Sequence, residues 1–344
     1  MKTSRTWLVL PLIIALIFVA AGPLASGPVA AQDDEFTVAV VTPSAVDDLA
    51  FSQSMVDALN LLMEEGLIAS VDVQDGTFVV DDAAVALRDW ASSGEYDLII
   101  AHGSQYGAIL EELAPEFPDT SFAWGTDVNT FGLDNVYAYT AASEEGGYVL
   151  GVLGANLSET GTVGVVGPIE VGDAKLFVDG FVYGAESSGM ATPLEPIYIG
   201  SFSDVALATE AAETLIANDA DVLTGSAQMV VGAIGVAKEN EALWLGTQAS
   251  QADLSEGSGV AFQVYHWEVI LREIVALIGE GTLGGQSFTI DLENEGLVIE
   301  YGQYELSEEL QALADETIAG IIDGSIEALP AEDMEPAATE EAED

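Results

Sequence analysis

The sequence predicts an α/β protein built of two similar lobes, and three observations support this prediction. From Phe36 onward, short continuous apolar runs alternate with longer segments whose apolar residues recur every three or four positions, as strands and helices do in parallel sheets. This alternation completes one set of elements by about residue 142 and then starts again. With 344 residues, 49% of them apolar, the chain is long enough to form two ordinary domains with substantial cores.

The first predicted lobe begins with a buried strand at Phe36–Val41. An amphipathic helix follows, because four apolar residues with spacings of four, four and three fall on one helical face: Phe51, Met55, Leu59 and Leu62. Asp47 or Asp48 is suited to cap the start of this helix. The remaining elements of the lobe are strands at Ser70–Val73, Asp97–Ala101, Ser121–Trp124 and Val136–Tyr139, with helices around Ala83–Ala91 and Gly107–Phe117.

The second predicted lobe repeats the alternation. Its helices are expected at Glu144–Leu157, Leu176–Glu186, Val205–Ala217 and Met229–Lys238, and its strands at Thr162–Val166, Pro196–Ile199, Asp221–Leu223 and Ala242–Leu245. Later elements follow, and periodicity alone leaves open which lobe they complete. They are strands at Val260–Val264, Phe288–Ile290 and Leu297–Tyr301, and helices at Trp267–Ile278 and Ser307–Ile322.

The two ends of the chain differ in composition from the rest. Lys2 and Arg5 precede a 15-residue apolar run, Trp7–Ala21, and a stretch of small residues ends at Ala31, which is typical of a cleaved export signal. An uncleaved membrane anchor is the alternative, but the run is short of the ~20 residues that a spanning helix needs. We therefore expect residues 1–31 to be removed and the protein to be exported to the periplasm or the cell surface. Residues 328–344 are predicted to be a disordered acidic tail.

The charge and the lack of cysteine exclude several functions. The chain holds 59 Asp and Glu against 6 Lys and Arg, a net charge of −53. We expect no binding to nucleic acid or to an anionic membrane surface, because basic residues would have to neutralise those partners. Without cysteine the chain forms no disulfide and holds no cysteine-ligated metal. Such acidity indicates a medium with strong salt screening or a low pH.

Motifs of common enzymes are missing from the sequence. It has no GxxxxGK[ST] phosphate loop, no GxGxxG after a predicted strand and no GxSxG turn. The two histidines, His102 and His266, lie far apart without a metal-ligand spacing. His102 ends a predicted strand, where α/β sheets place ligand groups, so we interpret it as a ligand contact or a loop residue. We expect no catalytic residue, no metal and no cofactor, and therefore no enzyme.

Several segments, taken in order, resemble one family. They are SAVDDLAFSQ (Ser44–Gln53), EEGGYVLGVLGA (Glu144–Ala155), TGTVGVVGPIE (Thr160–Glu170), FVDGFVYGA (Phe177–Ala185) and YIGSFSD (Tyr198–Asp204). These segments are similar to those of the basic membrane protein family, substrate-binding proteins of ABC transporters related to the purine nucleoside receptor. The resemblance covers roughly residues 36–322.

The resemblance implies the type I periplasmic binding protein fold, in which two Rossmann-like three-layer lobes are joined by three crossovers. These crossovers would lie near Thr140, Tyr265 and Asp291. Lobe 1 would then comprise residues 36–142 plus 266–290, and lobe 2 residues 143–262 plus 291–326.

The resemblance also implies a ligand site between the lobes. Phe51 and Phe202 correspond to two aromatic residues that sandwich a planar base, although the alternative for Phe51 is a core position. Gln248 and Gln263 stand where many relatives carry an acidic residue and a lysine that grip a ribose, so we expect a neutral amide pair there. Lys175 lies at the mouth of the second lobe and meets either the ligand or an acidic side chain. The full set of predicted ligand-binding residues is Asp47, Asp48, Phe51, Gln53, His102, Tyr106, Lys175, Phe202, Gln248 and Gln263.

The sequence therefore predicts an exported solute-binding protein of an ABC importer that captures a small planar ligand, such as a nucleoside, a nucleobase or a related heterocycle. Its partners would be that ligand and the permease and ATPase subunits at the membrane, and it is expected to be a monomer. The alternative is an extracellular ligand-sensing subunit of a membrane receptor with the same two-lobed fold. Because amides replace the charged ribose contacts, we expect a free base to bind at least as well as its nucleoside.

Overall fold

The computed structural model describes residues 35–331 of the chain. The predicted export signal and residues 332–344 of the predicted acidic tail lie outside the described residues. Ala328 and Leu329, which composition assigned to that tail, are buried, and Ala328 packs against Tyr148 and Val152. This part of the tail prediction is wrong, because the two apolar side chains are covered by the folded chain. No helix among residues 35–331 is long and apolar enough to cross a membrane.

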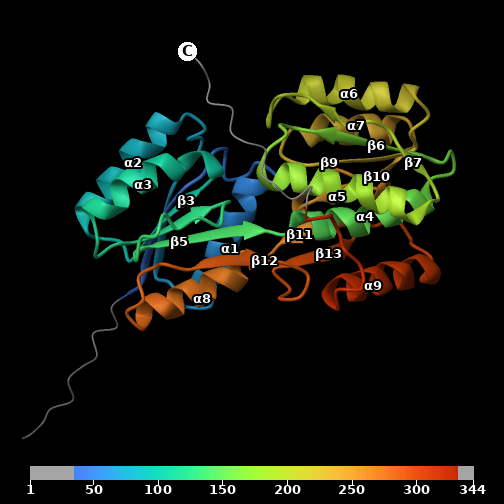
Figure 1. Cartoon of the computed structure of the whole chain (residues 1–344). Coiled ribbons are helices and arrows are strands. Elements are labelled where there is room, and N and C mark those ends of the chain that lie inside the picture. The colour runs from blue at the N-terminus through green and yellow to red at the C-terminus, as the bar shows by residue number, and fades with distance from the viewer. Residues whose placement is uncertain (1–34, 332–344) are drawn as a thin grey trace, which may run out of the picture. The chain divides into compact units, whose positions relative to one another are not determined.

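The first sheet has six strands among the described residues, in the order β12-β5-β4-β3-β1-β2, and all neighbouring pairs are parallel (Figure 1). These strands are β1 (Thr37–Val41), β2 (Ser70–Gln74), β3 (Leu98–His102), β4 (Ser121–Gly125), β5 (Val136–Ala141) and β12 (Ser287–Ile290). The sheet is packed with α1 (Phe51–Glu64), α2 (Val80–Ser93), α3 (Gly107–Leu113) and α8 (Glu268–Gly279). We call this sheet with its helices lobe A.

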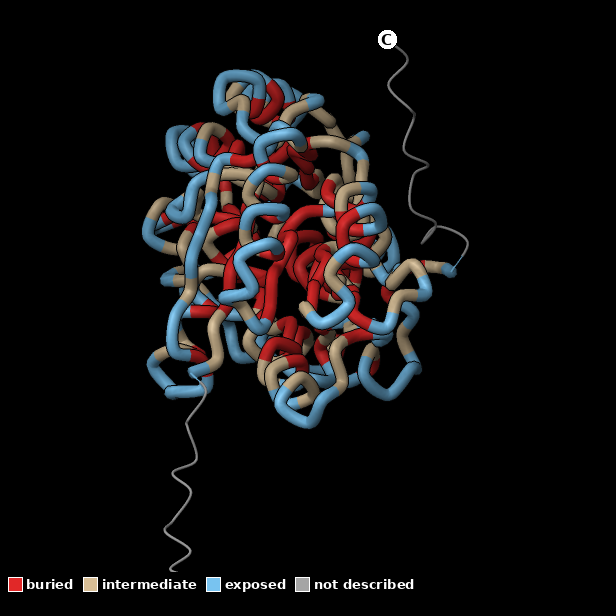
Figure 2. Tube along the Cα trace, turned by 90° about the vertical axis from the view of Figure 1, so that its left-hand side faces the viewer, coloured by how far each residue is buried: buried red, intermediate tan, exposed pale blue. Residues whose placement is uncertain are grey.

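Alternation along the strands explains why lobe A has three layers. Successive side chains of a strand point to opposite faces of the sheet. Val38 and Val40 pack in one core with α1 and α8, whereas Ala39 and Val41 pack in another with α2 and α3. Figure 2 shows the buried residues gathered in the interior, with exposed residues along the outer turns. Both faces of the parallel sheet are thus covered, as such sheets require.

The second sheet follows the order β13-β11-β10-β9-β6-β7, and β8 also pairs with β6. Its strands are β6 (Thr162–Gly167), β7 (Thr192–Pro193), β8 (Ile197–Tyr198), β9 (Val222–Gly225), β10 (Leu243–Thr247), β11 (Gly259–Tyr265) and β13 (Leu297–Tyr301), of which β13 is antiparallel to β11. Its helices are α4 (Ser143–Leu157), α5 (Gly172–Ser188), α6 (Val205–Ala217), α7 (Val230–Glu239) and α9 (Glu308–Ile322). We call this sheet with its helices lobe B.

Within residues 35–331 the chain passes between the two sheets three times. It leaves lobe A after β5 to begin α4, returns after β11 to begin α8, and leaves again between β12 and β13. The resemblance implied crossovers near Thr140, Tyr265 and Asp291, and the residue bounds of the two lobes stay a prediction. The predicted fold class is confirmed: two mainly parallel α/β sheets of the type I arrangement are joined by three crossovers.

Helices α4 and α5 pack unusually closely, and glycines allow it. A Cβ built on Gly147 would lie 2.3 Å from the carbonyl oxygen of Phe177, and one built on Gly151 would lie 2.1 Å from that of Phe181. The segments around these residues, EEGGYVLGVLGA and FVDGFVYGA, carried much of the resemblance. Their glycines therefore serve the packing of lobe B, where backbone approaches backbone.

Candidate ligand site

The carboxyl ends of strands from the two sheets face each other. The side-chain amide of Gln251, which follows β10, donates a hydrogen bond of 3.4 Å to the carbonyl of Leu49, which follows β1. The ring of Phe78, which follows β2, contacts the ring of Phe202, which follows β8. Open parallel sheets bind ligands at these strand ends. The region between the lobes is therefore the candidate site.

Phe51 begins α1 and lies flat against His102. The ring centroids are 3.8 Å apart and the planes differ by 9°. Trp267 meets both rings edge-on, at 6.3 Å from Phe51 and 5.5 Å from His102. One face of the Phe51 ring is thus covered, while the residue as a whole stays partly accessible. We call the Phe51 ring on its His102 backing the Phe51 platform, and stacking of a planar group on it stays a prediction.

His102, which lies against the Phe51 ring, is held in its neutral form. It is fully buried, and burial lowers the pKa of His102 to about 3, so the ring is neutral. Its Nε2 lies 3.2 Å from the carbonyl oxygen of Phe51, and its Nδ1 lies 2.8 Å from the hydroxyl of Tyr139. Since a carbonyl only accepts, we assign the hydrogen to Nε2, and the Tyr139 hydroxyl then donates to Nδ1.

The bond between His102 and Tyr139 crosses an intervening strand. Both residues pair in register with Gly125 of β4, His102 from β3 and Tyr139 from β5. A Cβ at position 125 would lie 2.2 Å from the Tyr139 ring. The lack of a side chain at Gly125 therefore gives the two rings the space in which to meet.

Asp48 fixes the start of α1. Its carboxylate accepts hydrogen bonds from the backbone N–H groups of Ala50, Gln53 and Ser52, at 2.9, 3.1 and 3.2 Å. It also accepts from the hydroxyl of Ser44. These bonds satisfy donors that a helix start leaves unpaired, so Asp48 takes the capping role that the sequence offered. Asp47 beside it is exposed.

Tyr106 is fully buried and holds the loop after β2. Its hydroxyl donates to the carbonyl of Thr77 at 2.8 Å, and the hydroxyl of Thr77 donates to the carbonyl of Thr42 at 2.9 Å. The next residue, Phe78, is 56% exposed. Sequence reasoning missed Phe78, although an aromatic residue directly after Gly76 and Thr77 at a strand end was a usable signal.

The predicted residues of lobe B lie at several places. Phe202 is partly buried, and its carbonyl accepts from the backbone N–H of Met229 at 3.0 Å. Lys175 forms an ion pair with Asp179, one helical turn further along α5. The structure thus gives Lys175 the acidic partner that the sequence offered as one of two alternatives.

Gln248 and Gln263 share one neighbour, Tyr265. The side-chain oxygen of Gln248 accepts from the backbone N–H of Tyr265 at 3.3 Å, and the side-chain amide of Gln263 donates to the Tyr265 hydroxyl at 3.1 Å. Gln263 is fully buried, and its side-chain oxygen lies against Gly146. The two amides are therefore close in the fold and both bind protein groups, while the side-chain oxygen of Gln263 is enclosed without a hydrogen-bond partner among the described residues.

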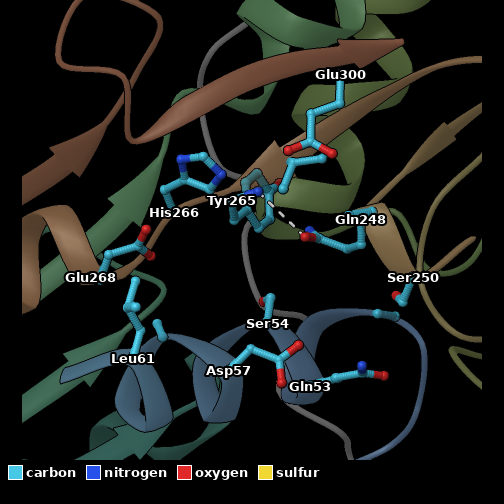
Figure 3. Close-up of a pocket in the computed structure, with 14 residues that line it drawn as sticks. Gln53, Ser54, Asp57, Leu61, Gln248, Ser250, Tyr265, His266, Glu268 and Glu300 are labelled. Atoms are coloured by element: carbon cyan, nitrogen blue, oxygen red, sulfur yellow. Dashed lines mark hydrogen bonds between the residues drawn. The ribbon is translucent and has the colours of Figure 1, made fainter. Parts of the chain in front are cut away.

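A pocket of about 220 Å³ lies between α1 and the connection after β11 (Figure 3). Gln53 and Asp57 of α1 line one side, and Gln248 and Glu300 of lobe B line another. Of the predicted residues it brings together Gln53 and Gln248, whereas Phe51 and Phe202 are not part of its lining. Its other lining residues are Ala50, Ser54, Ala58, Leu61, Ala249, Ser250, Val264, Tyr265, His266 and Glu268.

Two carboxyl groups at the first crossover were not predicted from the sequence. Glu144 is only 7% exposed, and Asp173 accepts a hydrogen bond of 3.2 Å from the hydroxyl of Thr140. Burial raises the pKa of each to about 7. One oxygen of each, Oε2 of Glu144 and Oδ2 of Asp173, is enclosed without a hydrogen-bond partner among the described residues. The sequence signal was only an acid in the first turn of each helix, which is common on exposed helices too.

The described part of the chain holds no group of three or more His, Cys, Asp or Glu residues that could bind a metal ion. The features at the junction are instead an aromatic platform, hydrogen-bonding amides and enclosed carboxyl groups. Two α/β lobes with facing strand ends and such a junction define a two-lobed solute-binding protein. The chain belongs to the family of PnrA-like ABC transporter substrate-binding proteins, whose model matches residues 36–333.

Known proteins show the same relationship. The chain is 26% identical over 245 residues to a purine-binding protein of Brucella abortus, a match that covers 71% of this chain and 69% of that protein. It is 27% identical over 205 residues to basic membrane protein A of Borreliella burgdorferi, covering 59% of each, less than two thirds of that relative's length. A solute-binding protein of an ABC transporter system from Conexibacter woesei has a TM-score of 0.73 at 23% identity, covering 85% of this chain and 98% of that chain. The structural likeness supports the fold.

Proposed function

We propose that this protein is an exported solute-binding protein of an ABC importer that captures a small planar heterocycle, a nucleobase or nucleoside, between its lobes. It would deliver this ligand to permease and ATPase subunits at the membrane and act as a monomer, without a catalytic step of its own. Family membership supports binding of a solute. The purine-binding relative supports the choice of a planar nitrogen heterocycle.

The observation that carries the proposal is the Phe51 platform. A ring that begins a helix at the carboxyl end of a parallel sheet, backed by His102 and edged by Trp267, cannot turn away easily. Such a held ring costs little entropy when a planar group stacks on it. Stacking of a base on an aromatic side chain contributes ~1–3 kcal/mol and tolerates different bases.

Mass spectrometry of small molecules released from the purified, heat-denatured protein tests the proposal directly. We expect a purine or a related heterocycle among them. Calorimetry with adenine, adenosine, guanine and guanosine, with glucose and leucine as non-planar controls, then ranks the ligands. Because Gln248 and Gln263 carry no charge for a ribose, the free bases should bind at least as tightly as their nucleosides. Binding of glucose or leucine in preference to all four purines would refute the proposal.

A further inference from the structure

The contact between Phe78 and Phe202 lies far from the three crossovers. The crossovers involve β5 and β12 of lobe A and β11 and β13 of lobe B, which stand together at one end of each strand order. The first crossover enters lobe B through α4, whose first residue, Ser143, is hydrogen-bonded to Tyr265 of β11. Phe78 follows β2, at the opposite end of the first sheet, and Phe202 follows β8, which pairs with β6 near the opposite end of the second. The two rings therefore meet across the side of the molecule that lies away from the connections.

Each ring stands on an anchored loop. Phe78 directly follows the buried Thr77, which is bonded to Thr42 and Tyr106. The Phe202 carbonyl is bonded to Met229, and the hydroxyl of Ser201 accepts the backbone N–H of Asp204 at 3.1 Å. The positions of the two rings are thus set within each lobe before the lobes meet.

The rings touch each other directly. Their centroids are 6.3 Å apart and their planes are inclined by 61°, which is the edge-to-face arrangement that aromatic pairs favour. Phe78 remains 56% exposed, and its ring pairs with an aromatic partner of the other lobe. A ring kept in solvent by a rigid loop gains its contact only when the lobes are together.

We propose that Phe78 and Phe202 form a latch that holds the two lobes closed at the side away from the crossovers. The proposal rests on the proposed function in one respect, because closure matters for a protein that encloses a ligand. When lobes rotate about their connections, groups far from the connections move most. A contact at this distance therefore breaks early on opening and contributes directly to the balance between open and closed forms.

The absence of cysteine from the sequence makes this balance measurable, since two introduced cysteines are the only thiols that a spin label can meet. Val85→Cys on α2 and Met190→Cys just after α5 place labels at strongly exposed positions of lobe A and lobe B. Double electron–electron resonance then gives the distribution of distances between the lobes in the ligand-free protein. Phe78→Ala should raise the ratio of open to closed forms about two- to tenfold, the effect of losing one aromatic pair.

Two further variants make the result specific. Val79→Ala changes the neighbouring residue of the same loop, which is 61% exposed, and should leave the distance distribution as in the parent protein. Phe202→Ala removes the other ring and should reproduce the effect of Phe78→Ala. The latch is refuted if the Phe78→Ala distribution coincides with that of Val79→Ala.

This experiment fails or succeeds independently of the ligand. It uses the ligand-free protein, so a latch without purine binding would leave the proposal standing while the proposed function falls. Purine binding with an unchanged distance distribution in Phe78→Ala would refute the latch and leave the proposed function standing. Thermal melts of each variant confirm folding, which we expect because Phe78 is exposed.

Discussion

Phe51 and Phe202, which the sequence paired as two halves of one clamp, stand in different surroundings. Phe51 begins a capped helix and has His102 against its face and Trp267 against its edge. Phe202 stands in a loop, and its ring contact is with Phe78 of the other lobe. One aromatic residue is thus built into its own lobe, while the other depends on the opposite lobe.

From this difference we expect ligand binding and stability to be combined at Phe51 and separated at Phe202. A side chain that packs against its own core supports the fold whether or not a ligand is present. A side chain whose contact crosses between lobes affects the closed form and leaves each lobe intact. The next four predictions test the two rings, the buried carboxyl groups of lobe B and the cap of α1.

Phe51→Ala should have the largest effect, because it removes both the platform and the contacts with His102 and Trp267. We expect affinity for the purine that binds tightest in calorimetry to fall about 5- to 150-fold. The free energy of unfolding should also fall by ~1–3 kcal/mol, less than for a fully buried Phe because the ring is partly accessible. Calorimetry and urea unfolding measure the two effects separately.

Phe202→Ala provides the comparison, since it should weaken binding without a comparable loss in unfolding free energy. Phe117→Ala changes a partly buried position just before β4, at the amino ends of the strands and away from the candidate site, and controls for loss of a ring as such. Equal destabilisation by Phe51→Ala and Phe202→Ala would break the contrast between the two rings.

Buried titratable groups of the two lobes also differ in their protonation. His102 behind Phe51 stays neutral at ordinary pH, whereas Glu144 and Asp173, which begin helices of lobe B, have pKa values raised to about 7 by burial. Their pKa values in the unfolded chain are about 4.5 and 3.8, so the folded chain holds more protons between these values and 7. Stability should therefore decrease as pH rises from about 4 to 7 and level off above, with at most about 3 kcal/mol from Glu144.

Urea unfolding at several pH values checks this slope. Glu144→Gln should flatten it, because the amide does not titrate, while Glu186→Gln at the exposed end of α5 should leave it unchanged. An identical slope in the parent protein and in Glu144→Gln would mean that Glu144 gains no proton on folding.

The smallest expected effect is at the cap of α1. Asp48→Ala removes the acceptor of three backbone N–H groups and should cost ~1–2 kcal/mol of unfolding free energy, with a slight loss of affinity because Phe51 is then less well placed. Asp47→Ala, at the exposed neighbouring position, is the matched control and should change neither quantity. If both variants unfold at the same urea concentration, the Asp48 bonds do not stabilise the start of α1.

The elements of the fold could be predicted because their apolar spacing is regular. Each predicted strand and helix among the described residues occurs within a few residues of its expected place, including the late helix Glu268–Gly279, whose lobe the periodicity left open. The short strand Thr192–Pro193 was missed, since two residues without an apolar run carry no period. Disorder of the last residues was predicted from composition alone. Composition does not reveal that Ala328 is buried against lobe B.

The candidate site was less predictable, because its contacts depend on register and on loops. The topology rule placed His102 at a strand end, and the resemblance added Phe51, Phe202, Gln248 and Gln263. The stacked rings of Phe51 and His102 belong to residues 51 positions apart in the sequence. The spacing of residues within either segment does not predict this contact. Phe78 was missed because loop residues follow no period, although its place just after a predicted strand was a usable signal. Whether the predicted set contacts a ligand stays a prediction.

Gly125 stands behind the groups that we expect to touch a ligand. The ring a ligand would meet rests on His102, His102 is oriented by Tyr139, and the space between the two is left by one missing side chain. A methyl group at that position would lie 2.2 Å from the Tyr139 ring, so the ring that orients His102 would have to shift. Selectivity in such a protein can therefore drift, or be engineered, through a residue hidden inside a sheet while the binding surface keeps its composition.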